Sequence, residues 1–290
     1  HMSMNIFGFG SSRYSSFQME PLTDDQLRER APSIFATEAH ESRSERFAHI
    51  PTQAVIAGLR AEGFQPYSAK QGNSRIPGKA EFTKHMIRFR HVDFDKTELE
   101  VGSDIHEIAL VNSHDGTSAY QLMSCLMRTI CLNGMIVSKG YEGVRVRHTG
   151  DAVNQVIEGA YTVLKQGPEV LRQIGDWRQT GLSREEQMFF AEGAHALRVE
   201  VAKNSPEPEE LLKIRRTADK GAELYTTMNV VQENVIKGGM LFLRPRVDEN
   251  GRTMRPVRAR TKEVKSIDGD TRLNRELWAL AEKMHELKAA

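Results

Sequence analysis

The sequence predicts an α+β fold: an antiparallel β-meander with a buried helix in the N-terminal half, and a helical C-terminal half. Three observations carry this prediction. Several segments between residues 64 and 148 alternate apolar and polar side chains, which is typical of strands. Beyond residue 150, apolar residues instead recur every three or four positions, as they do on one face of a helix. Hydrophobic residues make up 39% of the 290-residue chain, which is enough for a sizeable core.

The N-terminal region is expected to contain an arm and two helices. Residues 1–20 are rich in Ser, Gly and Phe and predict a flexible arm. A short helix is expected over 22–30, because Thr23 is a suitable N-cap and a proline follows the segment. Residues 52–62 predict a second helix, which ends at Gly63.

The middle of the chain is expected to form the sheet and one buried helix. Period-two patterns predict four strands, at 64–71, 83–92, 107–113 and 143–148. The segment 118–132 is apolar almost all round a helix, which is typical of a helix that is buried on every face. We therefore expect a buried helix between the third and fourth strands.

Helical periodicity covers most of the remaining chain. The expected helices span 151–166, 168–178, the segments after Ser183 and Pro206, 222–237 and 270–288. Ser183 and Glu186 form a capping box. The spacing within 222–237 also suits pairing with another helix, within one subunit or between subunits.

These patterns divide the chain into three regions. They are a flexible arm (1–20), an α+β core domain (21–150) and a mainly helical region (151–290) with a basic loop at 238–265.

Overall composition excludes little. The chain has 40 Lys and Arg against 39 Asp and Glu, so its net charge of +1 predicts no partner. Its two cysteines, Cys125 and Cys131, would lie on different faces of one helix and are expected to be free thiols in a reducing compartment. No apolar run is long enough to span a bilayer, and no secretory signal is recognisable. We therefore expect a cytoplasmic protein without a membrane partner.

Two of the expected strands carry basic residues on one face. Alternation places Lys84, Arg88 and Arg90 together and the apolar side chains of that strand opposite. Arg145 and Arg147 repeat the pattern in the last strand. Such a sheet face can follow a phosphate backbone, with aromatic residues as stacking platforms. Alternatively, carboxylates from the helices neutralise it.

The segment 237–265 is the most basic in the chain. It contains nine Lys and Arg against three Asp and Glu, a local net charge of +6, and its glycines and prolines predict a loop or hairpin. Guanidinium groups bind phosphate oxygens bidentately. We therefore expect nucleic-acid contacts from five arginines here: Arg244, Arg246, Arg255, Arg258 and Arg260. An ordinary solvated loop is the alternative.

The turn 112–118 offers candidates for catalysis. His114 and Asp115 carry acid–base or metal-ligand chemistry, and Thr117 or Ser118 could cap the expected helix, whose first amides can hold an anion. A polar turn with a helix cap is the simpler interpretation.

No metal or cofactor is expected. His40, His49, His85 and His114 could join Glu45 at a metal, but their spacing does not match the two-histidine zinc helix. The sequence has no P-loop, no dinucleotide glycine fingerprint, no Cys/His zinc spacing and no nucleophile elbow. These absences weigh against an enzyme.

Six segments together carry a family resemblance: HESRSER at 40–46, TKHM at 83–86, NSHDGTS at 112–118, RHTGD at 147–151, QENVIKGG at 232–239 and IDGD at 267–270. Over about residues 20–288 the chain resembles a family borne on phages, plasmids and cryptic prophages, catalogued as domain of unknown function nine-three-two. The family name carries no established activity, so the resemblance implies no catalytic residues. Residence on mobile elements would favour DNA metabolism or a role against host defence. The expected architecture is also similar to the core of phage single-strand annealing proteins, which form rings or filaments that hold one DNA strand in a basic groove.

Three functional hypotheses follow. The main one is a homo-oligomeric protein that binds or anneals single-stranded DNA in recombination or replication, with the strand arginines in a groove and the 244–260 segment as a clamp. The second is a metal-dependent nuclease or other phosphoester hydrolase centred on His114 and Asp115. The third is a protein that counters a host defence factor, with its basic segment against an acidic protein surface.

Overall fold

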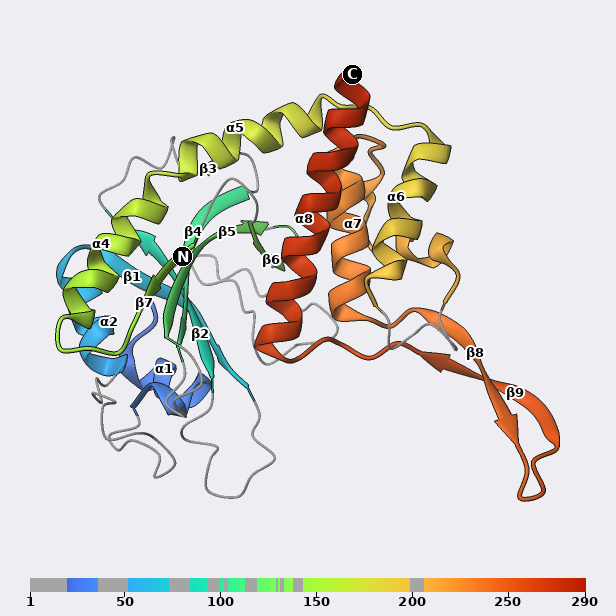
Figure 1. Ribbon diagram of the computed structural model, residues 1–290, viewed down its shortest axis with the longest axis horizontal. Helices are drawn as coiled ribbons and strands as arrows, with labels where there is room; N and C mark the ends of the chain where they lie inside the picture. The colour runs from blue at the N-terminus through green and yellow to red at the C-terminus, as the bar shows by residue number, and fades with distance from the viewer. Residues whose placement is uncertain are drawn as a thin grey trace, which may run out of the picture. The chain divides into compact units, whose positions relative to one another are not determined.

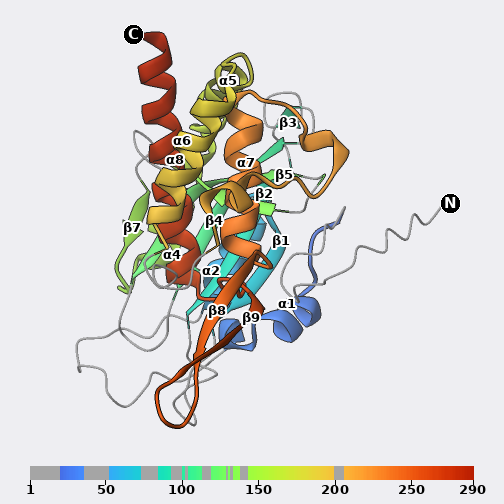
Figure 2. The same cartoon turned by 90° about the vertical axis from the view of Figure 1, so that its right-hand side faces the viewer.

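The computed structural model describes residues 20–35, 52–72, 84–92, 100–101, 104–112, 119–128, 130, 133–137, 143–198 and 206–290. They fall into two compact units. The first comprises the chain up to Met135 together with 142–168, and the second comprises 136–141 together with 169–290. Figures 1 and 2 show the elements in chain order.

The described part of the first unit is built on a seven-stranded sheet. Its strands are β1 (Phe64–Gln71), β2 (His85–His91), β3 (Glu100–Val101), β4 (Asp104–Asn112), β5 (Tyr120–Arg128), β6 (Asn133–Ile136) and β7 (Val144–Val146). The main order is β1-β2-β4-β5-β6, with β3 beside β4 and β7 beside β5. The pairs β1–β2, β2–β4, β4–β5 and β5–β7 are antiparallel. The predicted α+β class with an antiparallel sheet is confirmed, whereas β3 and β6 were not predicted.

Helices cover one face of this sheet. They are α1 (Asp24–Arg30), the 3-10 helix η1 (Pro32–Phe35), α2 (Thr52–Ala61) and α4 (Ala152–Leu164). The predicted cap of α1 is confirmed, because Thr23 and Gln26 form a capping box. Helices α2 and α4 pack against each other and against the sheet (Figure 1), and the core lies between these two layers. Because α4 belongs to this core, the first unit extends to residue 168.

The segment predicted to be a buried helix is strand β5, so that prediction is wrong. Eight of its nine residues are buried. Tyr120 and Leu122 enter the core under the helices, and the alternate residues Met123 and Cys125 are buried on the other side. A strand that is covered on both faces has no polar side, so its sequence does not alternate and resembles that of a buried helix. Cys125 is a free thiol, as predicted, and Cys131 lies outside the described residues.

A buried histidine network joins the sheet to the end of α4. His106 Nε2 lies 3.0 Å from Ser124 Oγ, and that hydroxyl donates to Gln166 Oε1 at 2.8 Å. Because the serine hydroxyl gives its proton to Gln166, the ring donates its Nε2 proton to the serine. Burial lowers the pKa of His106 from 6.5 to about 4.

This lowered pKa predicts that acid destabilises the first unit. The folded ring resists protonation while the unfolded ring accepts a proton below pH 6.5, so stability falls from about pH 6.5 down to about pH 4 and then levels off. The total loss is about 3 kcal/mol. Urea unfolding across this range measures it, and His106→Gln, whose side chain stays neutral, should lose this part of the slope. Parallel pH profiles for the two proteins would contradict the assignment.

The second unit is mainly helical, as predicted. Its elements are α5 (Gly167–Arg178), α6 (Arg184–Ala196), η4 (Pro208–Leu212), η5 (Thr217–Asp219), α7 (Leu224–Lys237), β8 (Leu241–Val247), β9 (Thr253–Arg260) and α8 (Ile267–Ala289). Ser183 caps α6 through the predicted capping box with Glu186. The helix predicted after Pro206 is the short 3-10 helix η4. The chain's two tryptophans, Trp177 and Trp278, are both fully buried in this unit, with ring centroids 4.5 Å apart.

Helix α7 is the centre of the second unit and packs against α6, α8 and η4. Most of its polar residues are buried, and several are hydrogen-bonded. Gln232 donates to Asn274 on α8 at 2.8 Å, and Asn234 donates to the carbonyls of Leu211 and Lys213 at 2.8 and 3.0 Å. The QENVIKGG segment therefore holds the unit together, and the helix pairing that its spacing suggested occurs within this unit.

Glu233 on α7 is a buried carboxylate among cations. Arg216 contacts it through both terminal nitrogens, at 2.7 and 2.6 Å, and Lys237 Nζ lies 3.4 Å away. Burial acts to raise the pKa of Glu233, but the hydrogen bonds from Arg216 and the nearby positive charges outweigh it. The pKa of Glu233 therefore lies below its ordinary value, and the carboxylate stays ionised.

Candidate nucleic-acid interface

Strands β8 and β9 form an antiparallel hairpin that extends from the helices of the second unit (Figures 1 and 2). The register pairs Leu241 with Arg260 near the base and Val247 with Thr253 near the tip. The hairpin alternative for the basic segment is therefore confirmed. The positions of the arginines follow from this register.

The tip of the hairpin is held by Asp248. Its side chain accepts the amide protons of Asn250 and Arg252 at 2.9 and 2.8 Å. Its carbonyl accepts from Gly251 at 3.0 Å, and the positive φ of that glycine, 76°, suits a residue without a side chain. One of the three acidic residues in 237–265 is thus engaged in its own turn.

The base of the hairpin is fixed to the end of α7. Gly238 has a φ of 70°, and a Cβ there would lie 2.6 Å from the carbonyl oxygen of Lys262, so only glycine fits. Gly239 donates to the carbonyl of Thr261 at 2.8 Å. Arg215 donates to the Gly238 carbonyl at 2.5 Å. The hairpin therefore leaves the helical unit from a defined position.

The hairpin arginines are exposed and lack carboxylate partners. None of them forms an ion pair with a residue that the structure describes; they are Arg244, Arg246, Arg252, Arg255, Arg258 and Arg260. Two of them make weaker local contacts: Arg260 donates to the Gly239 carbonyl at 2.8 Å, and Arg246 lies 3.9 Å from the sulfur of Met254. Their charges remain available to a ligand.

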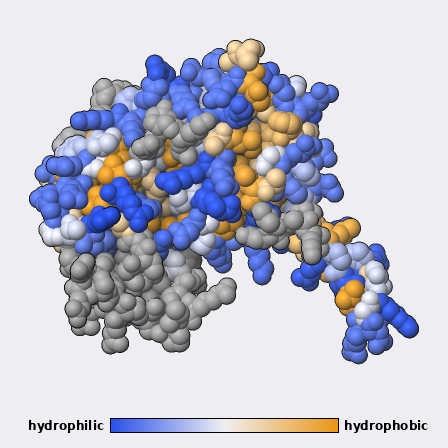
Figure 3. Space-filling model, viewed as in Figure 1, coloured by the Kyte–Doolittle hydropathy of each residue, from blue (hydrophilic) through white to orange (hydrophobic). Residues whose placement is uncertain are grey.

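The register mixes arginine with apolar side chains on both faces of the hairpin, and Figure 3 shows polar and apolar surface together on the face toward the viewer. The register places Arg258 and Arg260 on the face of Leu243 and Leu241. Leu243 and Val247 are 63% and 66% exposed. An extended anionic ligand with apolar surfaces between its charges would match both components.

Two prolines limit how the hairpin can be used. Pro245 lies in β8 and Pro256 lies in β9. A proline provides no amide proton, so each strand has an interrupted row of donors for a third strand. Contacts made by side chains are therefore favoured over strand addition.

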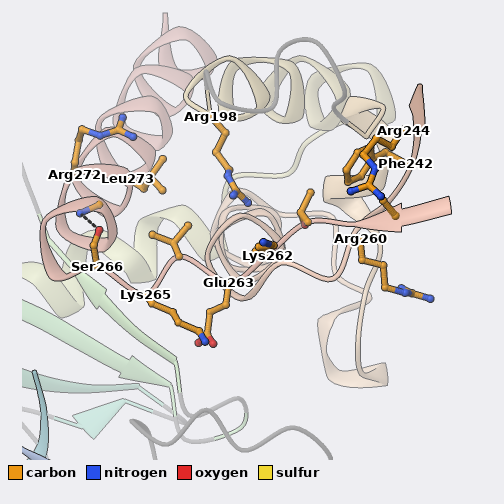
Figure 4. Close-up of a pocket in the computed structure, with 14 residues that line it drawn as sticks. Arg198, Phe242, Arg244, Arg260, Lys262, Glu263, Lys265, Ser266, Arg272 and Leu273 are labelled. Carbon is orange, nitrogen blue, oxygen red and sulfur yellow. Dashed lines mark hydrogen bonds between the residues drawn. The ribbon is translucent and has the colours of Figure 1, made fainter. Parts of the chain in front are cut away.

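A cleft of about 450 Å³ lies at the base of the hairpin, beside the start of α8 (Figure 4). Six cationic residues line it: Arg198, Arg244, Arg260, Lys262, Lys265 and Arg272. Glu263 is the acidic residue among the described lining. Arg198 and Arg272 were not predicted from the sequence, because they lie outside the basic segment 237–265: Arg198 follows α6 and Arg272 lies in α8.

Arg88 and Arg90, predicted to line a basic groove, are paired within the sheet. Arg88 Nη1 and Arg90 Nε lie 3.4 and 2.8 Å from the carboxylate of Glu107, which is fully buried. Arg88 is 7% exposed and also donates to Ser68, while Arg90 stacks over the ring of Tyr67. The basic face of β2 is thus neutralised, as the alternative interpretation expected. The carboxylate comes from the neighbouring strand β4, however, and not from a helix. A phosphate would have to displace Glu107 to reach either arginine.

The other basic candidates of the first unit differ from these two. Arg145 and Arg147, in and beside β7, are exposed and form no ion pair with the described residues. Lys84 is half-buried before β2. Arg145 and Arg147 therefore remain candidates for nucleic-acid contact.

Most of the catalytic and metal candidates lie outside the described residues, namely His40, Glu45, His49, His114 and Asp115. His85 is buried, with Nδ1 3.1 Å from Ser33 Oγ. In the described part of the chain, no group of three His, Cys, Asp or Glu side chains is placed to hold a metal ion. The nuclease and host-defence hypotheses stay predictions. None of the described helices combines the length and apolarity needed to cross a bilayer.

Comparisons with known proteins identify relatives over almost the whole chain. The chain is 40% identical over 264 residues to UPF0380 protein YafZ of Escherichia coli (strain K12), covering 91% of this chain and 92% of that protein. It is 39% identical to UPF0380 protein YfjQ of the same organism, with the same coverage. No solved structure matches. The family model described as Domain of unknown function (DUF932) matches residues 39–278, and the chain therefore belongs to that family.

Proposed function

We propose that this protein binds nucleic acid through the β8–β9 hairpin, and that its ligand is single-stranded DNA handled in recombination or replication. The observation that carries the proposal is the set of six exposed arginines on one hairpin without carboxylate partners among the described residues. Arg88 and Arg90 of the first unit, by contrast, pair with the buried carboxylate of Glu107. The hairpin arginines therefore have the charge that a phosphate backbone would neutralise.

The hairpin also suits side-chain contact with a flexible strand. Guanidinium planes bind phosphates and stack on exposed bases, and apolar side chains can cover the faces of unstacked bases. Phe242 is the aromatic residue of β8 and is half-buried, so arginine would supply most of the stacking. A two-stranded ribbon also fits the major groove of a duplex, which makes duplex DNA the comparison that the experiment needs.

Binding of labelled single-stranded and double-stranded DNA of equal length, from about 50 to about 300 mM salt, tests the proposal. Single strands should bind more tightly. If each of the six arginines meets one phosphate, log K against log salt should have a slope of about −4. Light scattering on the same samples should show an oligomer. No binding at the lowest salt would overturn the proposal. Tighter binding of the duplex would show that the ligand is double-stranded and not single-stranded DNA.

A further inference from the structure

We infer that the cleft at the hairpin base binds a phosphomonoester or polyphosphate group, either of a free nucleotide or of the phosphorylated end of a DNA strand. The second source rests on the proposed function, whereas the first does not. The cleft lies wholly within the second unit, and the long hairpin beyond it carries its own exposed arginines. It is therefore a site of different shape from the exposed hairpin.

The charge of the cleft points to a ligand with at least two negative charges. The fold gathers the cations from separate places: Arg198 follows α6, Lys262 and Lys265 precede α8, and Arg272 lies in α8. Neither lysine forms an ion pair with a described residue. The lining has six cations and one carboxylate. This positive charge is more than the single negative charge of an internal phosphodiester would balance.

Arg272 and Arg198 also have contacts outside the cleft. Arg272 contacts Glu276 at 3.0 Å, but both side chains are more than two-fifths exposed, and such surface pairs contribute little. Arg198 donates a hydrogen bond to the carbonyl of Val235 on α7 at 3.1 Å, so its guanidinium group has a neutral partner there. Figure 4 shows Arg198 extending toward the side of the cleft where Lys262 lies.

The start of α8 adds to this attraction. Ser266 caps the helix by accepting the amide proton of Gly269 at 3.0 Å, and both residues line the cleft. The first amides of a 23-residue helix carry partial positive charge. The two carboxylates of this turn, Asp268 and Asp270, are absent from the cleft lining, and Asp270 accepts from Asn274.

The size and the apolar wall of the cleft suit a nucleotide. Its volume of about 450 Å³ lies within the roughly 300–1,000 Å³ that is typical of small-ligand pockets. Phe242, Val264 and Leu273 contribute apolar surface beside the cations. A phosphate group on the cations would leave a base or sugar to meet this wall.

Calorimetric titration of the full chain with pyrophosphate and with ATP at low salt tests the site. Both should bind. The variant K262Q/R272Q changes two exposed side chains and should weaken binding at least about tenfold. The matched control, R246Q/R255Q, removes the same charge from hairpin positions outside the cleft and should bind pyrophosphate like the unmodified protein. Equal losses in the two variants would indicate general attraction to positive charge and would overturn the site.

Oligonucleotides with a 5′-phosphate or a 5′-hydroxyl distinguish the two sources. Tighter binding of the phosphorylated strand, lost in K262Q/R272Q, would assign the strand end, and equal binding of the two would assign the free nucleotide. Absence of pyrophosphate and ATP binding at about 1 mM would overturn the inference even if DNA binds. Pyrophosphate binding without DNA binding would contradict the proposed function alone.

Discussion

Replacing Arg246, Arg252, Arg255 and Arg258 with glutamine is expected to weaken binding of single-stranded DNA by about 100- to 1,000-fold at moderate salt. All four side chains are exposed, unpaired among the described residues and outside the cleft. Each lost phosphate contact should also reduce the slope of log K against log salt by about 0.7. Fluorescence anisotropy across a salt series measures both quantities.

The protein should stay folded in this experiment. Substitutions on an exposed surface usually change stability by less than about 0.5 kcal/mol each. The comparison variant is R145Q/R147Q, which removes two exposed arginines from the first unit. If the hairpin variant bound normally and R145Q/R147Q did not, the interface would lie at β7 instead.

Glu233→Gln is expected to reduce the free energy of unfolding by about 3 kcal/mol, and at most about 5. The substitution removes the carboxylate that Arg216 and Lys237 share inside the second unit, and leaves Arg216 with Asp219, 2.6 Å away, as its remaining carboxylate partner. Arg216 is about a quarter exposed, so water relieves part of its charge and the lower figure applies. Urea unfolding at neutral pH measures the loss.

Glu276→Gln provides the matched control. It removes the same charge from a pair with Arg272 at 3.0 Å that lies on the surface of α8. A surface pair of this kind contributes less than about 1 kcal/mol. Similar losses in the two variants would show that burial of Glu233 has little effect on the strength of its ion pair.

Local signals predicted much of the fold. Thr23 and Ser183 mark helix starts because capping depends on residues within one turn. The strand over Phe64–Gln71 was predicted with its observed bounds because its pattern is local too. Strand β5 was mistaken for a helix because burial on both faces removes the period-two signal. Which faces are covered depends on distant elements.

The candidate site was predicted in part, for the same reason. The exposed hairpin arginines form one continuous basic segment, so the sequence predicted all of them but Arg252 as nucleic-acid contacts. The pairing of Arg88 and Arg90 with Glu107 depends on which strand lies beside β2 and in which register. Arg198 and Arg272 meet at the cleft only through the packing of the helical unit. No local pattern carries such information.

The buried tryptophan pair gives the protein an intrinsic spectroscopic reporter of one unit only. Trp177 and Trp278 are the chain's two indoles, and both belong to the second unit. Their exposure to water on unfolding would shift tryptophan emission to longer wavelength, while unfolding of the first unit would leave the two indoles packed together. Far-ultraviolet circular dichroism reports both units. Coincidence or separation of the two signals would therefore show whether the units unfold as one cooperative system or as two.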